Sequence, residues 1–339
     1  MSAAEHQAWT PAETQVLVRA MTRAPSVHNT QPWLLEVAPG ALSVRERAEP
    51  VLPHHDPHGR DRAASCGAAV ANLELAARAL GRSCAAAFLP EHGQPDLVAR
   101  LAVGGPEAPA TEELRRFGAI THRVSHRAPF EGVAVPGPVV REIAGAGGAP
   151  GVEARPVRAG REIAVVARLL HHAAESFRRD SGYQRELSLW TIRDESSHRH
   201  GVGLAAGRIP AGSVPWAGLV RRATEVPARA ELAHRLSGET LLLFVTADDT
   251  RLDHVRAGYA LERAWLAAVG LGLAAAVLTQ PLHLEPVRSA LCEDLGLTGF
   301  PQALLRIGYA AEVIPPAPRR AAEEVLRPAA HHDPSAPGR

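Results

Sequence analysis

The sequence predicts an α+β fold made of two related halves that pack as an intramolecular pseudo-dimer. Two alanine-rich helical segments carry this prediction, because Gly81 follows Gly67 by 14 positions and Gly272 follows Gly258 by the same 14. In both halves a proline stands nine positions after the second glycine. The period between the halves is far longer than that of solenoid repeats, which indicates an internal duplication. The alternative is a chance similarity between two alanine-rich helices.

The other predicted elements follow the same order in each half. Pro39 and Gly40 separate two short apolar runs, which predicts a β-hairpin. The long helix of the first half is apolar or small on nearly all faces, so we expect it to be buried. In the first half the predicted strands are residues 33–37, 42–45, 85–89 and 97–103 and the long helix is 65–80; in the second half the helix is 258–271 and the last strand is 303–310.

These elements divide the chain into a first half, residues 1–118, a second half, residues 119–327, and a tail, residues 328–339. The second half carries an insert of about 45 residues, roughly 180–225, that lacks helical periodicity. Long loops of this kind often act as lids or binding loops. Trp190 and Trp216 favour a packed segment over the alternative, a disordered linker.

Composition excludes several classes of protein. Of the 339 residues 46% are hydrophobic, which is enough for a sizeable core. Only 4% are aromatic, which argues against a surface on which the bases of single-stranded nucleic acid could stack. A formal charge of +1 gives no electrostatic case for binding nucleic acid or an anionic membrane. No window approaches the roughly 20 apolar residues of a membrane span. The N-terminus has no apolar signal core and the three cysteines show no CxxC spacing, so we expect a cytoplasmic protein.

The sequence contains no lysine, so all 37 residues counted as Lys+Arg are arginines. Pyridoxal phosphate chemistry needs a lysine for its Schiff base, and a Walker A loop needs the lysine of its GK[ST] motif. Neither is available in this chain. Any cationic contact to a phosphate must therefore come from a guanidinium, which can bind it with two hydrogen bonds.

Residues 24–33, APSVHNTQPW, connect a helical pattern to the first predicted strand. Pro25 disfavours helix at Ala24, and Pro32 favours extended geometry at Gln31. We therefore expect a stiff, extended connector that offers side-chain and backbone donors to a flat polar ligand. The alternative is an ordinary polar loop.

Arginines stand at two further positions of interest. Arg123 and Arg127 lie on either side of the Ser125 hydroxyl, and on an extended segment or at a helix start both can converge on one phosphate. Surface solvation is the alternative for this pair. Arg306 interrupts an apolar strand, where an unpaired charge is costly to bury, so it must reach an anion or solvent. A structural salt bridge is the competing interpretation for Arg306.

Residues 53–62, PHHDPHGRDR, carry three histidines, His54, His55 and His58, beside Asp56. A metal site is one interpretation. However, the adjacent histidines cannot easily both face one ion on regular structure, so we expect a solvated, proline-punctuated loop. The sequence has no GxSxG, no HExxH and no Cys/His cluster. We therefore expect no metal and no dedicated catalytic side chain.

Four stretches together resemble the flavin-dependent nitroreductase family: APSVHNTQPW, DPHGR followed by SCGAAVANLELA, RVSHRAPF, and LLRIGY followed by PPAPRRAAEEVL. Their order and spacing are most similar to a fused, single-chain branch, in which two halves mimic the usual homodimer and whose members are associated with bacterial dormancy and stress. The resemblance covers nearly the whole chain and weakens in the insert. It implies a nitroreductase-like fold.

The resemblance also implies an FMN site between the halves. By analogy, Arg123, Ser125, Arg127 and Arg306 would hold the FMN phosphate. A polar stretch of the first half would line the flavin ring, and a short stretch of the second half would lie near its reactive edge. These residues are Ser26, Val27, His28, Asn29, Thr30 and Gln31 for the ring, and Thr279, Gln280 and Pro281 for the edge. The other pseudo-symmetric position keeps neither stretch, so we expect one FMN per chain.

The implied function is an FMN-dependent oxidoreductase that takes hydride from NAD(P)H and reduces nitroaromatic or quinone-like acceptors, with the flavin supplying the chemistry. A second interpretation is a protein that stores or sequesters FMN beneath a lid that blocks nicotinamide. A third is an interaction or regulatory protein with a vestigial pocket. We expect a monomer with internal pseudo-symmetry, although a homodimer is compatible with the sequence, and no nucleic-acid or membrane partner.

Overall fold

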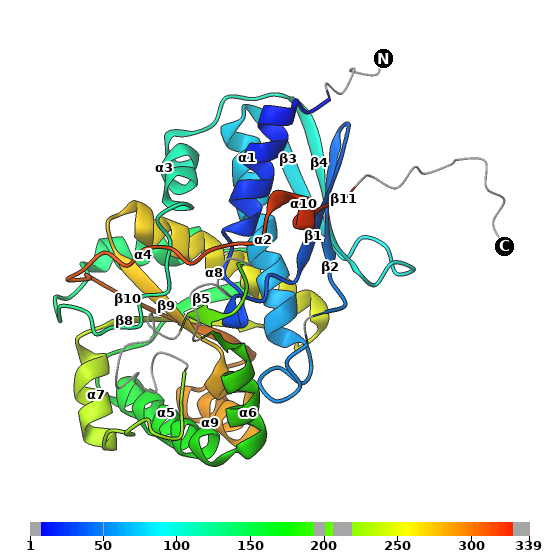
Figure 1. The fold of residues 1–339 in the computed structure, drawn as a ribbon. Helices are drawn as coiled ribbons and strands as arrows, with labels where there is room; N and C mark the ends of the chain where they lie inside the picture. The colour runs from blue at the N-terminus through cyan, green and yellow to red at the C-terminus, as the bar shows by residue number, and fades with distance from the viewer. Residues whose placement is uncertain (1–7, 50, 193–200, 206–218, 328–339) are drawn as a thin grey trace.

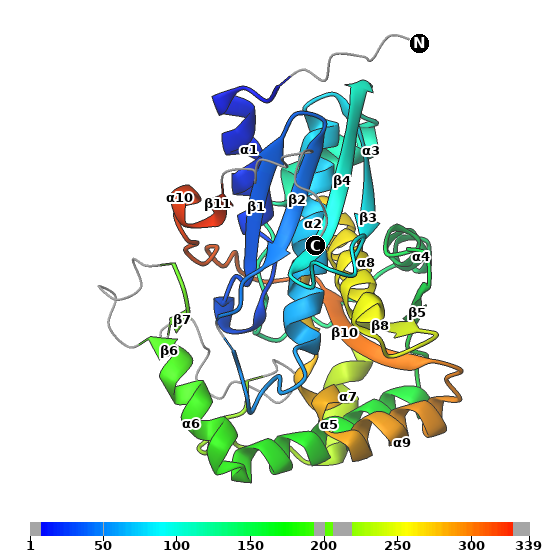
Figure 2. The same cartoon turned by 90° about the vertical axis from the view of Figure 1, so that its right-hand side faces the viewer.

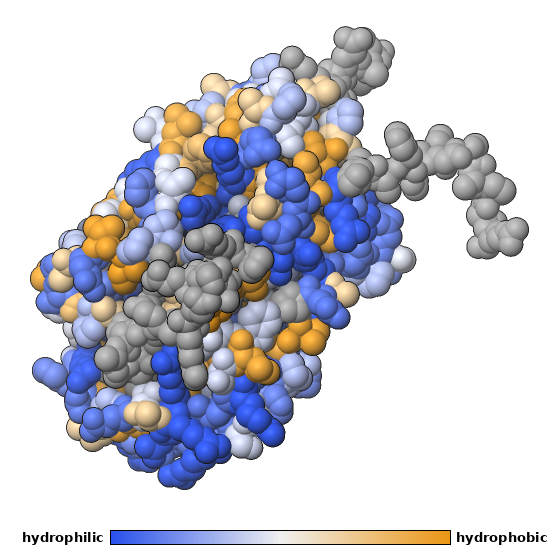
Figure 3. Space-filling view, viewed as in Figure 1, coloured by the Kyte–Doolittle hydropathy of each residue, from blue (hydrophilic) through white to orange (hydrophobic). Residues whose placement is uncertain are grey.

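The computed structural model describes residues 8–49, 51–192, 201–205 and 219–327. Two main sheets, each with its own long helix, stand above a group of helices that includes α5, α7 and α9 (Figure 1). On the face shown in Figure 3, hydrophilic and hydrophobic residues are interspersed. Within the described ranges, every helix is too short or too polar to cross a bilayer.

The first half builds a sheet whose strands lie in the order β11-β1-β2-β4-β3. The predicted hairpin is confirmed as the antiparallel pair β1 and β2. The last strand among the described residues, β11, joins this sheet in parallel with β1. The elements of this half are α1 (Pro11–Thr22), η1 (Val27–Asn29), β1 (Trp33–Ala38), β2 (Ala41–Glu46), α2 (Arg60–Ala79), β3 (Arg82–Phe88), β4 (Leu97–Pro106) and α3 (Thr111–Ala119).

The second half builds a sheet in the order β5-β8-β10-β9. Along β8, Leu241, Leu243 and Val245 pack with α5, α7 and α9, whereas Leu242 and Phe244 pack with α8 on the opposite face. This sheet is therefore covered by helices on both faces (Figure 2). The elements are α4 (Gly137–Ala146), β5 (Val152–Pro156), α5 (Arg161–Arg179), α6 (Ser181–Trp190), β6 (Thr191–Ile192), β7 (Leu204–Ala205), α7 (Arg229–Ser237), β8 (Thr240–Thr246), α8 (Arg251–Gly270), β9 (Ala274–Leu278), η5 (Gln280–His283), α9 (Glu285–Leu295), β10 (Phe300–Gly308), α10 (Ala322–Val325) and β11 (Leu326–Arg327).

The two sheets share one topology. The spatial order β1-β2-β4-β3 repeats as β5-β8-β10-β9. A 20-residue helix follows the second strand of each sheet: α2 connects β2 to β3, and α8 connects β8 to β9. The helices pack against each other at the predicted landmark glycines. A Cβ on Gly67 would lie 1.9 Å from the Val255 carbonyl oxygen, and one on Gly258 would lie 1.8 Å from that of Ala64. The α+β pseudo-dimer predicted from the glycine spacing is confirmed.

Both long helices begin earlier than predicted. α2 starts at Arg60 rather than at residue 65, and α8 starts at Arg251 rather than at residue 258. Thr250 caps α8, and its side chain and that of Asp253 form a capping box. The apolar pattern does not show these first turns, because they carry charged side chains. The predicted boundary between residues 118 and 119 falls at the end of α3 and stays a prediction.

The insert begins with a helix, contrary to the expectation that it lacks one. The Asp180 carboxylate accepts the backbone N–H groups of Gly182 and Tyr183, which caps the start of α6. Residues 193–200 and 206–218, which include Trp216, lie outside the described residues, as does the predicted tail 328–339. Several described residues of the insert line a cavity to which both halves contribute.

Candidate functional site

One cavity brings together the two polar stretches that the sequence singles out. Its wall combines segments of both halves: the turn before β1, the first turns of α2, the segment before α4, the end of β9 and residues 314–319. The predicted site residues at this wall are Ser26, Val27, His28, Asn29, Arg123, Ser125, Arg127, Thr279 and Gln280. Four others, Thr30, Gln31, Pro281 and Arg306, are buried away from this wall.

Residues 26–31 form a tight turn, not the extended connector that the two prolines predict. His28, Asn29 and Gln31 have positive φ angles of 49°, 57° and 52°. The Ser26 hydroxyl oxygen accepts the Gln31 backbone N–H at 3.0 Å, which closes the turn. Positive φ is unfavourable for residues that carry a side chain. The turn therefore needs support from other parts of the fold.

Two later segments of the chain supply that support. The Gly201 carbonyl accepts the side-chain amides of Asn29 at 2.8 Å and Gln31 at 2.6 Å. Arg319 donates to Asn29 Oδ1 at 2.7 Å, and the Arg320 backbone N–H donates to Gln31 Oε1 at 3.0 Å. The turn is thus held between the insert and the C-terminal segment, and those contacts outweigh the local preference for extended backbone.

Three arginines, Arg123, Arg127 and Arg319, contribute to the cavity wall. Among the described residues, Arg127 makes no hydrogen bond and no ion pair. Burial lowers the pKa of Arg127 to about 10. Burial, together with the charges of Arg123 and Arg23, lowers the pKa of Arg319 to about 9. Arg127 has lost its hydration without replacement partners, so an anion in the cavity would stabilise it. Arg319 donates to the Thr22 carbonyl at 2.7 Å and to Asn29 Oδ1 at 2.7 Å, so an anion there would mainly neutralise its charge.

Arg123 is the arginine with a carboxylate beside it. Its Nε lies 3.2 Å from Glu262 Oε1, and its guanidinium lies 4.8 Å from the centre of the Trp265 ring. Glu262, on α8, is fully buried, and burial raises the pKa of its carboxyl to about 7 although Arg123 opposes the shift. Near neutral pH this carboxyl is only partly ionised. Arg123 therefore keeps part of its positive charge for a ligand.

Arg306 does not reach the cavity, and the structure contradicts that part of the prediction. Its Nε and Nη2 each donate to the Glu239 carboxylate at 2.6 Å, and both side chains are buried. Its guanidinium lies 4.9 Å from the centre of the Phe130 ring. A buried carboxylate already neutralises this arginine, so the competing interpretation, a structural salt bridge, is the one observed.

The loop 53–62 is solvated only in part: Pro53, His54, Pro57 and His58 are exposed as expected, but His55 and Asp56 are buried. The Glu186 carboxylate on α6 accepts the backbone N–H groups of His54 at 2.9 Å and His55 at 2.8 Å. A helix of the insert thus holds the loop against the body of the protein. His55 reaches the cavity wall, and the ring of His28 lies 5.0 Å from its ring, centre to centre.

Some wall residues were not identified from the sequence. Arg319 belongs to the PPAPRRAAEEVL stretch, where a pair of arginines after a proline-rich run is the only local signal. Asp61 lies in the first turn of α2 and accepts a hydrogen bond of 2.6 Å from the Thr279 hydroxyl. The apolar part of the wall has no polar signature at all; it includes Ala64, Ala68, Leu204, Leu219, Leu261, Ala276 and Val277.

The chain is similar to proteins of Mycobacterium tuberculosis over nearly its whole length. It is 32% identical over 324 residues to a protein of strain H37Rv that is provisionally named an NAD(P)H nitroreductase, covering 93% of this chain and 91% of that protein. It is 29% identical over 330 residues to a second protein of that strain, named only as uncharacterized, covering 90% of each. No protein-family model matches the sequence.

Two solved structures also align with the chain. Nitroreductase A from Vibrio parahaemolyticus aligns with a TM-score of 0.40 at 15% identity, over 65% of this chain and 77% of that one. An NADPH:FMN oxidoreductase from Vibrio harveyi aligns with a TM-score of 0.36 at 16% identity, over 63% of this chain and 76% of that one.

Proposed function

Because this chain belongs to the NAD(P)H nitroreductase family, we propose that its cavity binds one FMN and that reduced nicotinamide supplies the electrons to reduce nitroaromatic or quinone-like acceptors. One observation carries the proposal. The turn 26–31 and the arginine-bearing segment 123–127, about a hundred positions apart in the sequence, meet at the wall of a single cavity.

The arginines fit the phosphate of FMN. A phosphate monoester carries between one and two negative charges near neutral pH. Arg127 has no protein partner within the described residues, and Arg319 and Arg123 are only partly neutralised. The Ser125 hydroxyl lines the same wall. These groups would take the phosphate, with Arg319 in the role that the sequence predicts for Arg306.

The remaining wall fits a flat ring with a polar edge. Small and apolar side chains such as Ala64, Ala68 and Leu261 offer a surface for the ring faces. The His28 Nε2 and Gln280 Nε2 atoms are buried without a hydrogen-bond partner in the described part of the chain. Both residues line the cavity, so both would bond the heteroatoms along the edge of the flavin.

The protein's own residues bind and orient the cofactor, and bound FMN supplies the hydride and electron chemistry. The strained turn 26–31 is clamped at Asn29 and Gln31 and so presents its polar groups in a fixed arrangement. The two halves of one chain contribute both sides of the cavity. We therefore also propose that the protein functions as a monomer.

A second function, storage of FMN without turnover, has its own supporting observation. The insert contributes Gly203, Leu204, Ala205 and Leu219 to the cavity wall, and Gly201 anchors the turn. A segment in this position would cover bound FMN and keep nicotinamide away from it.

The visible spectrum of the purified protein, followed by anaerobic titration with NADPH and NADH, tests the proposal. For an oxidoreductase we expect a yellow protein whose flavin absorbance bleaches rapidly and returns on addition of a nitroaromatic compound or a quinone. Yellow absorbance that persists through prolonged incubation would instead support storage. A colourless protein that takes up no added FMN would contradict both functions.

A further inference from the structure

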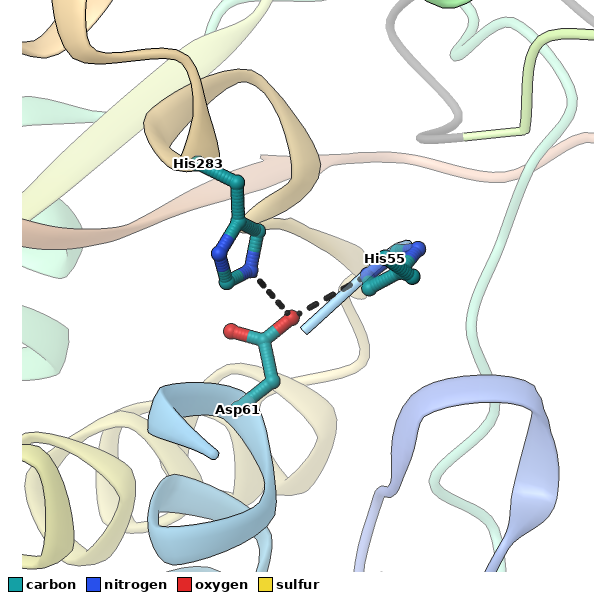
Figure 4. Close-up of side chains that lie close together, drawn as sticks. All are labelled: His55, Asp61 and His283. Carbon is teal, nitrogen blue, oxygen red and sulfur yellow. Dashed lines mark hydrogen bonds and ion pairs between the residues drawn. The ribbon is translucent and has the colours of Figure 1, made fainter. Parts of the chain in front are cut away.

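Three side chains outside the proposed FMN contacts converge on one point. His55 comes from the loop before α2, Asp61 from the first turn of α2, and His283 from the end of η5 (Figure 4). The Nε2 atoms of the two histidines lie 3.2 Å and 3.0 Å from the same carboxylate oxygen, Asp61 Oδ2. All three potential ligand atoms lie within 4.8 Å of one another. The side chains are 4%, 6% and 6% exposed, so water does not hydrate them freely.

These separations match the ligand shell of a small divalent ion. Bonds of roughly 2.0–2.1 Å to nitrogen and oxygen place the ligands of a tetrahedral ion about 3.3 Å apart. Two of the three separations are already within a few tenths of an ångström of that value. Two imidazoles with one carboxylate form a set that proteins use for Zn²⁺ and Fe²⁺ when a coordination position stays open for another molecule.

Among the described residues, the Nε2 atom of His283 contacts only the shared carboxylate. It lies 3.0 Å from Asp61 Oδ2, and this buried atom has no other partner in the described part of the chain. An ion lying between the two atoms would satisfy both.

The surroundings supply the supporting contacts that metal sites use. The Thr279 hydroxyl donates to Asp61 Oδ2 at 2.6 Å and fixes the orientation of the carboxylate. Asp56, whose Oδ1 is buried without a hydrogen-bond partner in the described part of the chain, lies near enough to Asp61 for the two carboxylates to interact. Arg60 adds an opposing positive charge. Two carboxylates against one guanidinium leave the centre favourable for a cation.

We propose that His55, Asp61 and His283 bind a divalent transition-metal ion of the Zn²⁺ class. His55 and Asp61 belong to the first half and His283 to the second, so the ion would join the halves. Because His55 and Asp61 also line the cavity, the open coordination position would face it and accept water or an oxygen atom of a small ligand. The inference stands apart from the proposed function, since it needs neither FMN nor turnover.

Zinc binding by the full-length, untagged protein tests the proposal. The protein is first treated with a chelator and then dialysed against Zn²⁺, and bound metal is counted by mass spectrometry while the thermal unfolding midpoint is followed. We expect one tightly bound ion per chain and a rise in the unfolding midpoint. X-ray absorption at the zinc edge should show two imidazole ligands.

Substitutions locate the ion. His283→Gln and Asp61→Asn should abolish tight binding and remove the rise in unfolding midpoint. Thr279→Val should weaken binding by the roughly 10–100-fold typical of a lost outer-shell contact. His58→Ala changes an exposed histidine of the same loop and should bind zinc as the wild type does. The thermal unfolding midpoint of each variant is also measured in the presence of chelator, where no metal is bound. A variant counts in the comparison when this metal-free midpoint matches that of the wild type.

Two outcomes overturn the proposal. One is the failure of the wild type to bind a stoichiometric ion, which would leave a hydrogen-bonded His-Asp-His cluster. The other is binding retained by both His283→Gln and Asp61→Asn, which would place the metal elsewhere in the chain.

Discussion

Gly67 on α2 and Gly258 on α8 lie at equivalent positions of the two halves, and each lacks a Cβ atom that would collide with the backbone of the other helix. The clash would be with carbonyl oxygens at 1.9 Å and 1.8 Å, and backbone atoms cannot move aside as a flexible side chain can. The closest approach of the halves therefore depends on two missing methyl groups.

Substitution of either glycine should separate the halves. We expect Gly67→Ala or Gly258→Ala to lower the free energy of unfolding by about 3 kcal/mol or more, since overpacking against backbone exceeds the usual cost of an added methylene. Urea unfolding measures this. Gly118→Ala is the matched control, because Gly118 also lies in a helix but has open space at its Cβ position, and it should be neutral or slightly stabilising. Equal effects at all three sites would contradict the close packing.

Arg127 should make a large contribution to FMN affinity. It lines the cavity without a partner among the described residues, so Arg127→Ala removes a charge-assisted contact and breaks no internal ion pair. We expect FMN binding to weaken by about 2 kcal/mol, roughly thirty-fold, measured by quenching of flavin fluorescence. Arg100→Ala is the control, because Arg100 is half-exposed and pairs with Glu91. An unchanged affinity in Arg127→Ala would remove this residue from the phosphate site.

Unlike Arg127→Ala, the substitution Arg306→Ala should lower the stability of the fold and leave the FMN affinity unchanged. The substitution leaves the buried Glu239 carboxylate without its partner, so we expect a loss of about 3–5 kcal/mol of stability in urea. FMN affinity of the folded fraction should stay the same, because Arg306 does not line the cavity. Weaker FMN binding with unchanged stability would restore the phosphate role that the sequence predicts.

Glu262 should make stability depend on pH near neutrality. Burial raises its folded pKa from the ordinary 4.5 to about 7, so between these values the folded protein holds a proton that the unfolded chain releases. Its contribution to stability is therefore most favourable at low pH and is lost as pH rises through about 7. From pH 6 to pH 8 the wild type should lose about 1 kcal/mol relative to Glu262→Gln, which cannot titrate.

Unfolding in urea at the two pH values, on wild type and Glu262→Gln, measures the difference. The Glu49→Gln variant controls for titration of an exposed carboxylate elsewhere in the chain. Parallel pH profiles for wild type and Glu262→Gln would show that this carboxyl does not titrate in the range.

One FMN per chain is the expected stoichiometry. Residues 26–29 of the polar turn and the arginines of segment 123–127 line the same cavity, and the sequence repeats neither stretch in the other half. Flavin absorbance measured against protein concentration should give a ratio near one after saturation with FMN. A ratio near two would show that the duplicated half has kept a working site.

Local patterns predicted much of the architecture. Alternating and continuous apolar runs located β1, β2, β3 and β4 of the first sheet but not β11, and the spacing from Gly67 to Gly81 and from Gly258 to Gly272 located the duplication. Those features depend on neighbours in the sequence. Polar first turns, such as that of α2, carry no apolar period, and for this reason the helices were predicted to start too late.

Long-range contacts decided what the sequence did not show. His28, Asn29 and Gln31 adopt positive φ because Gly201 and the C-terminal segment hold their side chains, and the flanking prolines give no sign of this. The burial of His55 likewise depends on Glu186, about 130 positions later. For Arg306 the sequence leaves a ligand contact and a salt bridge both open, because its partner, Glu239, lies on a neighbouring segment rather than beside it in the sequence.

The position of β11 bears on how the molecule is assembled during translation. Leu326 pairs with Leu35 of β1, and Arg319 reaches back to the turn at Asn29. Both contacts involve residues near the end of the described chain, so the ribosome must synthesise β1 to β10 before either contact can form. A nascent chain that stops short of these residues would expose the edge of β1 and leave the turn without its C-terminal contacts. The cofactor pocket would thus mature late in synthesis, after most of the polypeptide has emerged.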